Sequence, residues 1–292
     1  MIRCPSCTTK ISNVEAGCPR CGFSPINLEG FLAWAPELAH ENNGFRKENF
    51  QALTRVEEGS FWFRSRNTII RWALRKYFPD FDSMLEVGCG TGFVLKSIAK
   101  DFPQARIAGS EIYTAGLSEA ARRLPGVELS QMDARHLPYE DEFEILGAFD
   151  VIEHIIEDRL VLENFYRAIK PGGGCLITVP QHQWLWSPVD EVACHQRRYS
   201  ATDLHEKIEA AGFHIVRSTS FVTLLLPLML VSRLAARRSS SGPGSGRDAL
   251  TLNPTLDRML EAVMRFEQLL IKCGINFPLG GSRLVIAKKA PR

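Results

Sequence analysis

The chain has 292 residues, of which 45% are apolar and 23% are charged, the balance of a folded globular protein rather than a disordered one. Lys and Arg total 35 and Asp and Glu total 33, so the formal net charge is only +2, which argues against a protein built mainly to coat nucleic acid. No apolar run reaches the ~18–20 residues of a membrane-spanning helix. No secretory segment precedes the first cysteines, and we expect a cytoplasmic protein.

Four of the eight cysteines lie in the first 21 residues, in two Cys-x-x-Cys pairs. Cys4, Cys7, Cys18 and Cys21 supply four thiolates at the spacing of a tetrahedral metal site, which predicts a zinc ribbon over residues 1–25. Four sulfurs close the coordination shell, so we expect a structural zinc that stabilises this small module by ~10–16 kcal/mol. Redox disulfides are the alternative. The ribbon's partner stays open: a protein, RNA or the chain's own catalytic domain.

The chain after the ribbon divides into further zones. Residues 26–80 are expected to form a helical N-terminal extension. In residues 81–220, apolar runs alternate with helical patterns, which predicts parallel βαβ units in a Rossmann-like, doubly wound α/β sheet. Such a sheet binds ligands at the carboxyl ends of its strands. The predicted strands cover 83–87, 106–110, 127–130, 145–152, 175–179 and 214–219, and the predicted helices cover 93–101, 115–123, 160–169 and 201–211.

Residues 221–281 are predicted to be an apolar and helical insertion before the last core strand and tail at 282–292. The run Phe221–Val231 is apolar on all sides, and three arginines follow it by residue 238. It could lie in a membrane surface, line a tunnel for a lipophilic acceptor, or form core or a dimer interface. A flexible Ser/Gly linker is expected at 239–247. Beyond it, apolar spacing over 256–270 predicts a helix with one packed face.

A glycine cluster separates the first predicted strand from the helix that follows it. Gly88, Gly90 and Gly92 permit a sharp turn and a close approach of the backbone to a ligand. A dinucleotide fingerprint reads G-x-G-x-x-G, but here the third glycine comes one residue early and Phe93 takes the expected place. A ligand without a pyrophosphate is therefore favoured. The alternative is an ordinary strand-to-helix turn.

Carboxylates end three of the predicted strands. Glu111 ends the second strand and could accept both hydroxyls of a ribose. Asp133 follows the third strand and could accept a hydrogen bond from an adenine amino group, and Asp150 ends the fourth. Solvated loop carboxylates are the alternative for Glu111 and Asp133.

These motifs, together with Lys170-Pro-Gly-Gly173, resemble the ordered motifs of class I S-adenosylmethionine-dependent methyltransferases. The resemblance covers about residues 60–220 and the final strand. It implies S-adenosylmethionine as cofactor, with the glycines around its methionine part, Glu111 on the ribose, Asp133-Ala134 near adenine and Glu86 orienting the loop and the amino group. The cofactor contacts expected from it are Glu86, Gly88, Cys89, Gly90, Gly92, Glu111, Ile112, Asp133, Ala134 and Asp150.

His154 follows the fourth strand and faces the expected methyl position. There it could take a proton from a hydroxyl acceptor. Asp150, Glu153 and His154 also resemble the metal-associated acidic–His patch of some ubiquinone-biosynthesis O-methyltransferases. The alternative is a cluster at the start of a helix, beside Glu157 and Asp158.

The stretch after the fifth strand resembles a subset of these methyltransferases associated with glycan, lipid and quinone pathways. Asp190, His195, Arg198 and Tyr199 could bind an acceptor or act as a base. We count Asp190, His195 and Tyr199, with His154, as candidate catalytic residues. The alternative is a structural network in which Asp190 pairs with Arg198.

Together these features predict methyl transfer to a small-molecule, glycan or lipid-linked acceptor, on oxygen, with transfer to carbon or nitrogen as the alternatives. We expect peripheral membrane contact through residues 221–238 or a homodimer, and no nucleic-acid partner. One alternative is an RNA methyltransferase guided by the ribbon, disfavoured by the near-neutral charge and by the absence of an Asn-Pro-Pro-Tyr-like motif after the fourth strand. The other is a catalytically silent module that binds cofactor or a partner.

Overall fold

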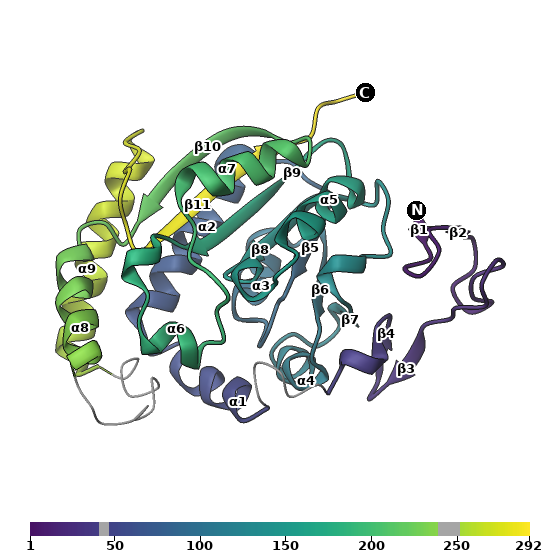
Figure 1. Ribbon diagram of the computed structural model, residues 1–292, viewed down its shortest axis with the longest axis horizontal. Coiled ribbons are helices and arrows are strands. Elements are labelled where there is room, and N and C mark those ends of the chain that lie inside the picture. Colours follow the sequence, from purple (N-terminus) through teal and green to yellow (C-terminus); the bar gives the residue numbers. More distant parts are fainter. Residues whose placement is uncertain (41–46, 239–251) are drawn as a thin grey trace.

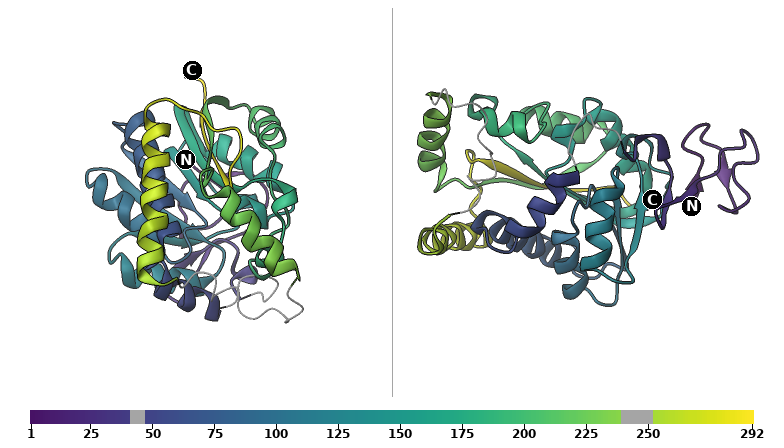
Figure 2. Two further views of the ribbon diagram at one scale, coloured as in Figure 1. Left: turned by 90° about the vertical axis from the view of Figure 1, so that its left-hand side faces the viewer. Right: turned by 90° about the horizontal axis from the view of Figure 1, so that it is seen from below.

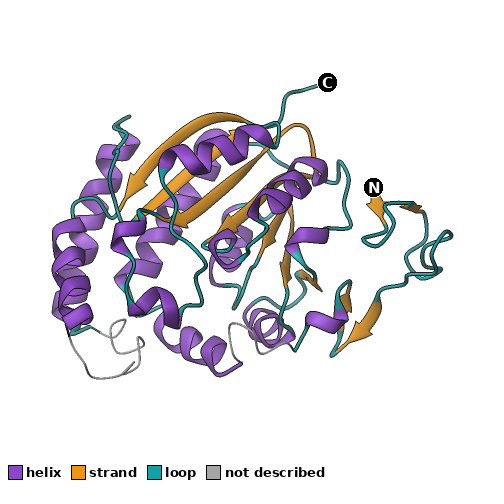
Figure 3. Ribbon diagram, viewed as in Figure 1, coloured by secondary structure: helices purple, strands orange, loops and turns teal. Residues whose placement is uncertain are grey.

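The computed structural model describes residues 1–40, 47–238 and 252–292, so the predicted linker at 239–247 lies outside the described residues. Its centre is a nine-stranded sheet with helices on both faces (Figures 1 and 3). The strands in spatial order are β10 (His214–Phe221), β11 (Ser282–Lys288), β9 (Ile169–Pro180), β8 (Phe143–Phe149), β5 (Ser83–Val87), β6 (Arg106–Glu111), β7 (Glu128–Gln131), β4 (Phe31–Ala33) and β3 (Ile26–Leu28).

The strands from β9 across to β4 are parallel, while β11 runs antiparallel to both of its neighbours and β3 runs antiparallel to β4. This confirms the predicted Rossmann-like sheet. The helices divide between its two faces: α5 (Asp158–Ala168) and α7 (Ala201–Ala210) lie on one, and α2 (Phe61–Tyr77), α3 (Phe93–Asp101) and α4 (Thr114–Arg123) on the other. Alternate strand residues fill the two layers, with Leu85 in one core and Met84 in the other.

Two predicted boundaries around the fourth and fifth strands are wrong. The run Gly172–Gly174 lies inside β9 rather than between a helix and a strand. A side chain there would collide with neighbouring backbone, because a Cβ on Gly173 would lie 2.2 Å from the Glu144 carbonyl oxygen and one on Gly174 2.3 Å from that of Ala287. β8 ends at Phe149, and residues 152–154 form a short 3-10 helix instead of continuing the strand.

The segment 26–80 is not helical throughout. Residues 26–33 form the β3–β4 hairpin, whose turn uses positive φ at Glu29 and Gly30, and β4 extends the sheet beside β7. The Gln131 side chain fixes this edge, because its amide accepts from the Ala35 N–H at 3.0 Å and donates to the Ala35 carbonyl at 2.8 Å. A short 3-10 helix, Pro36–Leu38, and α1 (Lys47–Val56) lead on to α2.

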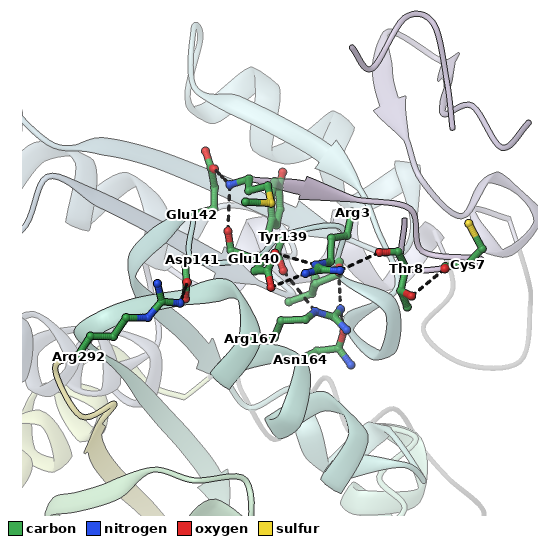
Figure 4. Close-up of polar contacts among 12 residues, drawn as sticks. Arg3, Cys7, Thr8, Tyr139, Glu140, Asp141, Glu142, Asn164, Arg167 and Arg292 are labelled. Atoms are coloured by element: carbon green, nitrogen blue, oxygen red, sulfur yellow. Dashed lines mark hydrogen bonds and ion pairs between the residues drawn. The ribbon is translucent and has the colours of Figure 1, made fainter. Parts of the chain in front are cut away.

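The cysteine-rich head carries a two-stranded sheet, β1 (Ile2–Arg3) with β2 (Lys10–Ile11), and docks on the connection between β7 and β8 (Figure 4). The Arg3 guanidinium donates two hydrogen bonds to Glu140, both of 2.7 Å. The N-terminal ammonium donates to Glu142 at 2.5 Å. Backbone bonds also join Arg3 to Pro138 and Glu140 to Met1, so the head is fixed by main chain as well as by charge.

Two helices, α8 (Leu226–Arg238) and α9 (Pro254–Lys272), lie at the end of the molecule opposite the head (Figures 1 and 2). The prediction of one packed apolar face for residues 256–270 is wrong. Leu260 and Met264 are buried, but Met259 and Phe266 are 63% and 57% exposed. The rest of the buried face consists of Asp257, Glu267 and Gln268, which hydrogen-bond to other segments, so the remaining apolar side chains of the helix point outward. No described helix is long and apolar enough to cross a bilayer.

Candidate active site

A cavity of about 460 Å³ opens at the carboxyl ends of the central strands. The glycine loop after β5, the ends of β6 and β8, and the residues after β7 form most of its wall, while Leu38 and Phe50 close it from the N-terminal extension. Nine of the ten expected cofactor contacts line it. The exception is Gly92, the N-cap of α3.

The glycine loop is held in a conformation that requires glycine. Gly88 has φ +71°, and a Cβ there would lie 2.5 Å from a methyl carbon of Val151. Gly90 has φ +52° and Gly92 has φ +73°, so the chain turns from β5 into α3 through three positive φ values. The Cys89 N–H donates to the Ser110 carbonyl at 2.9 Å, which joins the loop to the end of β6.

Glu111 is 8% exposed and holds the loop from the end of β6. One carboxylate oxygen accepts from the Gly90 N–H at 3.0 Å, and the other accepts from the N–H groups of Ile112 at 2.9 Å and Tyr113 at 3.3 Å. Burial raises the pKa of Glu111, and these three donors partly oppose that rise. Because a carboxylate accepts about four hydrogen bonds, it retains capacity for about one more, on the oxygen that accepts only from Gly90.

Asp133 is 5% exposed, so neither Asp133 nor Glu111 is a solvated loop carboxylate. Its side chain accepts from the Arg135 N–H at 2.9 Å and from the Arg135 guanidinium at 2.9 and 3.0 Å. Burial acts to raise the pKa of Asp133, but the Arg135 hydrogen bonds outweigh it and hold the pKa below its usual value. Arg135 was not predicted as a site residue. Its guanidinium pairs with Asp133 and therefore limits the hydrogen bonds that Asp133 can accept from a ligand.

Glu86 is buried at the end of β5 and lines the cavity. Its Oε2 atom has no hydrogen-bond partner within the described chain. Burial raises the pKa of Glu86 to about 8; Glu111 and Glu57 add to the rise and Arg66 opposes it. A buried acceptor without a donor fits a ligand that brings a cationic group.

Sequence reasoning missed Arg66, which reaches the cavity from α2. It forms a short ion pair with Asp150, the predicted cofactor contact at the end of β8. Its guanidinium carbon lies 4.7 Å from the centre of the Trp62 ring, a cation–π contact from one helical turn away. The partners Arg66 and Asp150 stand 84 residues apart, so no local pattern could join them.

Glu57 is a second missed residue. It follows α1, lines the cavity and is 4% exposed. It accepts from the Thr91 hydroxyl at 2.6 Å and from the Arg123 guanidinium at 2.8 Å. This contact ties the N-terminal extension to the glycine loop.

His154 and His195 lie next to each other, with ring centres 4.9 Å apart. We call this part of the site the acceptor side. His154 lines the cavity, and its Nδ1 lies 3.3 Å from the Cys194 carbonyl oxygen. Burial and then the nearby His195 lower the pKa of His154 to about 4, so its ring is neutral near pH 7. His195 does not line the cavity itself.

Asp190 is completely buried and contacts both a histidine and two arginines. It lies 2.9 Å from the Nδ1 atom of His195, and it accepts from Arg198 and Arg233 at 2.6 Å each. Although burial acts to raise the pKa of Asp190, His195 and the two arginines hold it well below its usual value. The expected structural pair with Arg198 therefore exists, and the same carboxylate also orients His195.

Tyr199 is not brought to the cavity. Its side chain is completely buried, and its hydroxyl donates to Asp158 at 2.7 Å and lies 3.2 Å from the Ile152 carbonyl oxygen. Asp158 also pairs with Lys207 and Arg197. The structure thus places Tyr199 in a buried polar network beneath the site.

Within the described residues, two clusters have metal-ligand composition and spacing. In the head, the Sγ atoms of Cys4 and Cys21 lie 3.5 Å apart, as do those of Cys7 and Cys18. Sulfurs bound to one tetrahedral zinc lie about 3.8 Å apart, so the four thiols fit such an ion.

The second cluster is Glu153, His154 and His195. Asp150 does not complete it, because its carboxylate pairs with Arg66 and His195 stands in its place. Glu153 is completely buried, and neither of its oxygens has a hydrogen-bond partner in the described structure.

Residues 84–173 match a family described as "Methyltransferase domain". A probable S-adenosylmethionine-dependent methyltransferase of Mycolicibacterium smegmatis is 28% identical over 164 residues, which is 55% of this chain and 62% of that protein. A trans-aconitate 2-methyltransferase of Methylobacterium nodulans is 30% identical over 34% of this chain and 38% of its own length. The matched part of the chain therefore spans less than two thirds of these relatives.

Solved structures show the same fold. Phosphoethanolamine N-methyltransferase 2 of Haemonchus contortus, in complex with S-adenosyl-L-methionine, superposes with a TM-score of 0.58 at 18% identity, over 87% of this chain and 59% of that one. The complex between the Haloferax volcanii Trm112 methyltransferase activator and a putative methyltransferase gives a TM-score of 0.52 at 18% identity, covering 82% of this chain and 96% of the matched chain.

Proposed function

We propose that this protein, which carries a methyltransferase domain on the class I fold, transfers the methyl group of S-adenosylmethionine to a hydroxyl of a small-molecule, glycan or lipid-linked acceptor. One observation carries the proposal: two buried carboxylates, Glu86 and Glu111, face the same cavity beside the glycine loop. Glu86 would accept a hydrogen bond from the cofactor's ammonium group, and Glu111 would accept one from a ribose hydroxyl. The bound cofactor supplies an electrophilic methyl group, so the protein's main task is alignment, worth ~7–11 kcal/mol.

Transfer to oxygen also requires a group that receives the acceptor's proton. His154 lies on the acceptor side and lines the cavity. Its Nδ1 lies beside the Cys194 carbonyl oxygen, so Nε2 is the ring nitrogen that can receive a proton. We assign it this role. His195, held by Asp190, is a positioning residue that packs against the His154 ring.

Calorimetry with S-adenosylmethionine and S-adenosylhomocysteine tests the cofactor assignment. We expect micromolar affinity for both, and a loss of about 10- to 100-fold in Glu111→Ala, because one charge-assisted hydrogen bond of ~1.5–3 kcal/mol disappears. Glu128→Ala is the matched control, because that carboxylate is exposed and pairs with the exposed Arg106. No binding by the wild-type protein would overturn the proposal.

An acceptor screen with methyl-labelled cofactor tests the chemistry. Hydroxyl-bearing glycans, polyprenyl-linked sugars and phenols are the acceptors to compare. We expect His154→Gln to lower kcat by about 100-fold, the low end of the roughly 10²–10⁴-fold that general-base catalysis contributes, because a pKa of about 4 makes His154 a weak base. The exposed His214 provides the control substitution. A product methylated on carbon or nitrogen, formed at an undiminished rate by His154→Gln, would contradict transfer to oxygen.

We further propose that the four head cysteines bind one structural zinc ion, and that the head serves the chain's own catalytic domain. The hydrogen bonds between Arg3 and Glu140 support this role, because they use one of the head's few basic side chains within the molecule. Elemental analysis should find one zinc per chain, and none after Cys18→Ser with Cys21→Ser. Cys273→Ser, at an exposed cysteine on the far side of the molecule, should retain the metal.

A further inference from the structure

The end of the molecule formed by α8 and α9 exposes an apolar surface. Of the eighteen large hydrophobic side chains that are exposed in the described part of the chain, ten lie between Leu224 and Leu279. The left view of Figure 2 looks onto this end, with both helices in front. We propose that these two helices bind the surface of an anionic membrane. The inference does not depend on the methyl acceptor.

α9 has two distinct apolar sides. At about 100° per residue, the buried positions Leu260, Met264 and Ile271 share one side of the helix. Met259, Phe266 and Leu269 fall on the opposite side and are 55–63% exposed. The inner side already packs on the protein, so the outer side is a second apolar stripe. Such a stripe suits a helix that lies in a membrane interface.

The acidic side chains of α9 turn inward. Glu267 is completely buried and accepts from the N–H groups of Val222, Thr223 and Leu224 at 2.6–2.7 Å. Asp257 is buried and Glu261 is partly buried; both pair with Arg64, and Glu261 also pairs with Arg265. These contacts keep negative charge away from the exposed side.

The exposed charges of α9 are therefore cationic. Arg258, Arg265 and Lys272 are exposed and recur every seven residues, along one edge of the apolar stripe; Arg265 also pairs with the partly buried Glu261. From residue 222 to residue 279 the chain has seven Lys and Arg against four Asp and Glu, a net charge of +3, which exceeds the +2 of the whole chain. Cations beside apolar side chains complement anionic lipid headgroups.

α8 repeats this pattern nearer to the cavity. Leu228 and Val231 are 51% and 64% exposed. On its inner side, Arg233 donates to Asp190 at 2.6 Å, and Asp190 contacts His195. The membrane-facing end is thus joined to the acceptor side of the cavity by two polar contacts.

A second copy of the chain is a weaker candidate for this surface. Two copies of α9 packed antiparallel would bring the cationic edge of one helix toward that of the other, which disfavours self-association. A lipid surface has the opposite charge.

Co-sedimentation with vesicles tests the proposal. We expect the protein to bind phosphatidylcholine vesicles that contain phosphatidylglycerol at least tenfold more tightly than phosphatidylcholine alone, with affinity falling as salt increases. Met259→Glu with Phe266→Glu should reduce binding at least tenfold and leave the melting temperature unchanged, because both side chains are exposed. Ile26→Glu is the matched control, at an exposed apolar residue near the opposite end.

Arg258→Gln with Lys272→Gln should lower affinity for anionic vesicles and leave the weaker binding to neutral vesicles unchanged. Failure to bind either vesicle, or equal binding by the Met259/Phe266 variant, would overturn the proposal. So would light scattering that shows a dimer which dissociates with the same two substitutions, because the surface would then be a subunit contact.

Discussion

Glu86 and Glu111 share a cavity, but their surroundings differ. Glu111 accepts three backbone N–H groups, whereas one oxygen of Glu86 has no partner in the described chain. A buried carboxyl without donors favours its neutral form, and a cationic ligand reverses that preference. Cofactor binding should therefore release a proton from Glu86.

The consequence is a pH-dependent affinity. The pKa of Glu86 is raised to about 8, and pairing with an ammonium group would lower it, so S-adenosylhomocysteine should bind more tightly as pH rises from 6 to 8, by up to about tenfold per pH unit. Calorimetry in buffers of different ionisation enthalpy measures the proton release directly. Glu86→Gln should bind more weakly and lose the pH dependence, and an unchanged slope in that variant would contradict the assignment.

Gly88 provides a steric prediction at the same scale. Gly88→Ala combines a positive φ with a Cβ contact of 2.5 Å to Val151, so we expect it to destabilise the protein by ~2–4 kcal/mol. Gly126→Ala is the control, because Gly126 also has positive φ but would meet nothing within 4 Å, and it should cost only ~1 kcal/mol. Chemical denaturation measures the stability of the two variants. Equal losses of stability would show that the positive φ, and not the contact with Val151, causes the destabilisation of Gly88→Ala.

At the scale of elements, the connection between β7 and β8 joins the head to the cavity. It begins with Met132 and Asp133, which line the cavity, and it ends with Glu140 and Glu142, which hold the head. The head also contributes to the core, since Cys4, Ile11 and Cys18 are buried in the same cluster as Trp34 and Leu137. Unfolding of the head should therefore disturb the part of the cavity wall around Asp133, where we expect the adenine of the cofactor.

Metal removal tests this coupling. A chelator should unfold the head, leave most of the helix signal in circular dichroism and weaken S-adenosylhomocysteine binding several-fold, because a metal-free module of this size loses the ~10–16 kcal/mol that folds it. Glu140→Ala should weaken binding in the same direction by a smaller factor without loss of metal. Unchanged cofactor affinity after chelation would show that the head and the cavity are independent.

How well an element could be predicted depends on its length and on the range of its contacts. The parallel strands of the core and the glycine loop were predictable, because apolar runs ending at Gly88 or Glu111 carry a local signal. The β3–β4 hairpin was not, since strands of three residues are too short to show alternation. The ion pair of Arg66 with Asp150 and the outward stripe of α9 arise from packing between distant segments, which spacing alone does not contain.

At the scale of the whole molecule, two ends with different chemistry flank one cavity. The cysteine-rich head lies beyond β7, and α8 and α9 lie at the opposite end (Figure 1). Among the described residues, three ion pairs link α2 and the acceptor side to the α8–α9 end: Arg64 with Asp257, Arg64 with Glu261, and Arg233 with Asp190. The apolar end is thus held rigidly relative to the site.

Arg233→Ala should separate the effect of the contact between Arg233 and Asp190 on turnover from membrane binding. Its loss removes one of the two arginine partners of Asp190 and should lower kcat several-fold, because His195 becomes less firmly positioned. Vesicle binding should change less, since the apolar stripes remain. A variant with normal turnover and lost vesicle binding would contradict this division.

The position of β11 also bears on how the protein is made. β10 is hydrogen-bonded only to β11 among the described strands, yet β11 is synthesised about sixty residues later and must enter between β9 and β10. On the ribosome, β10 and the exposed edge of β9 must therefore wait unpaired while α8 and α9 emerge. Nascent chains of this protein should depend on chaperones during that interval, and release of a chain truncated before residue 282 should yield aggregates instead of a shortened enzyme.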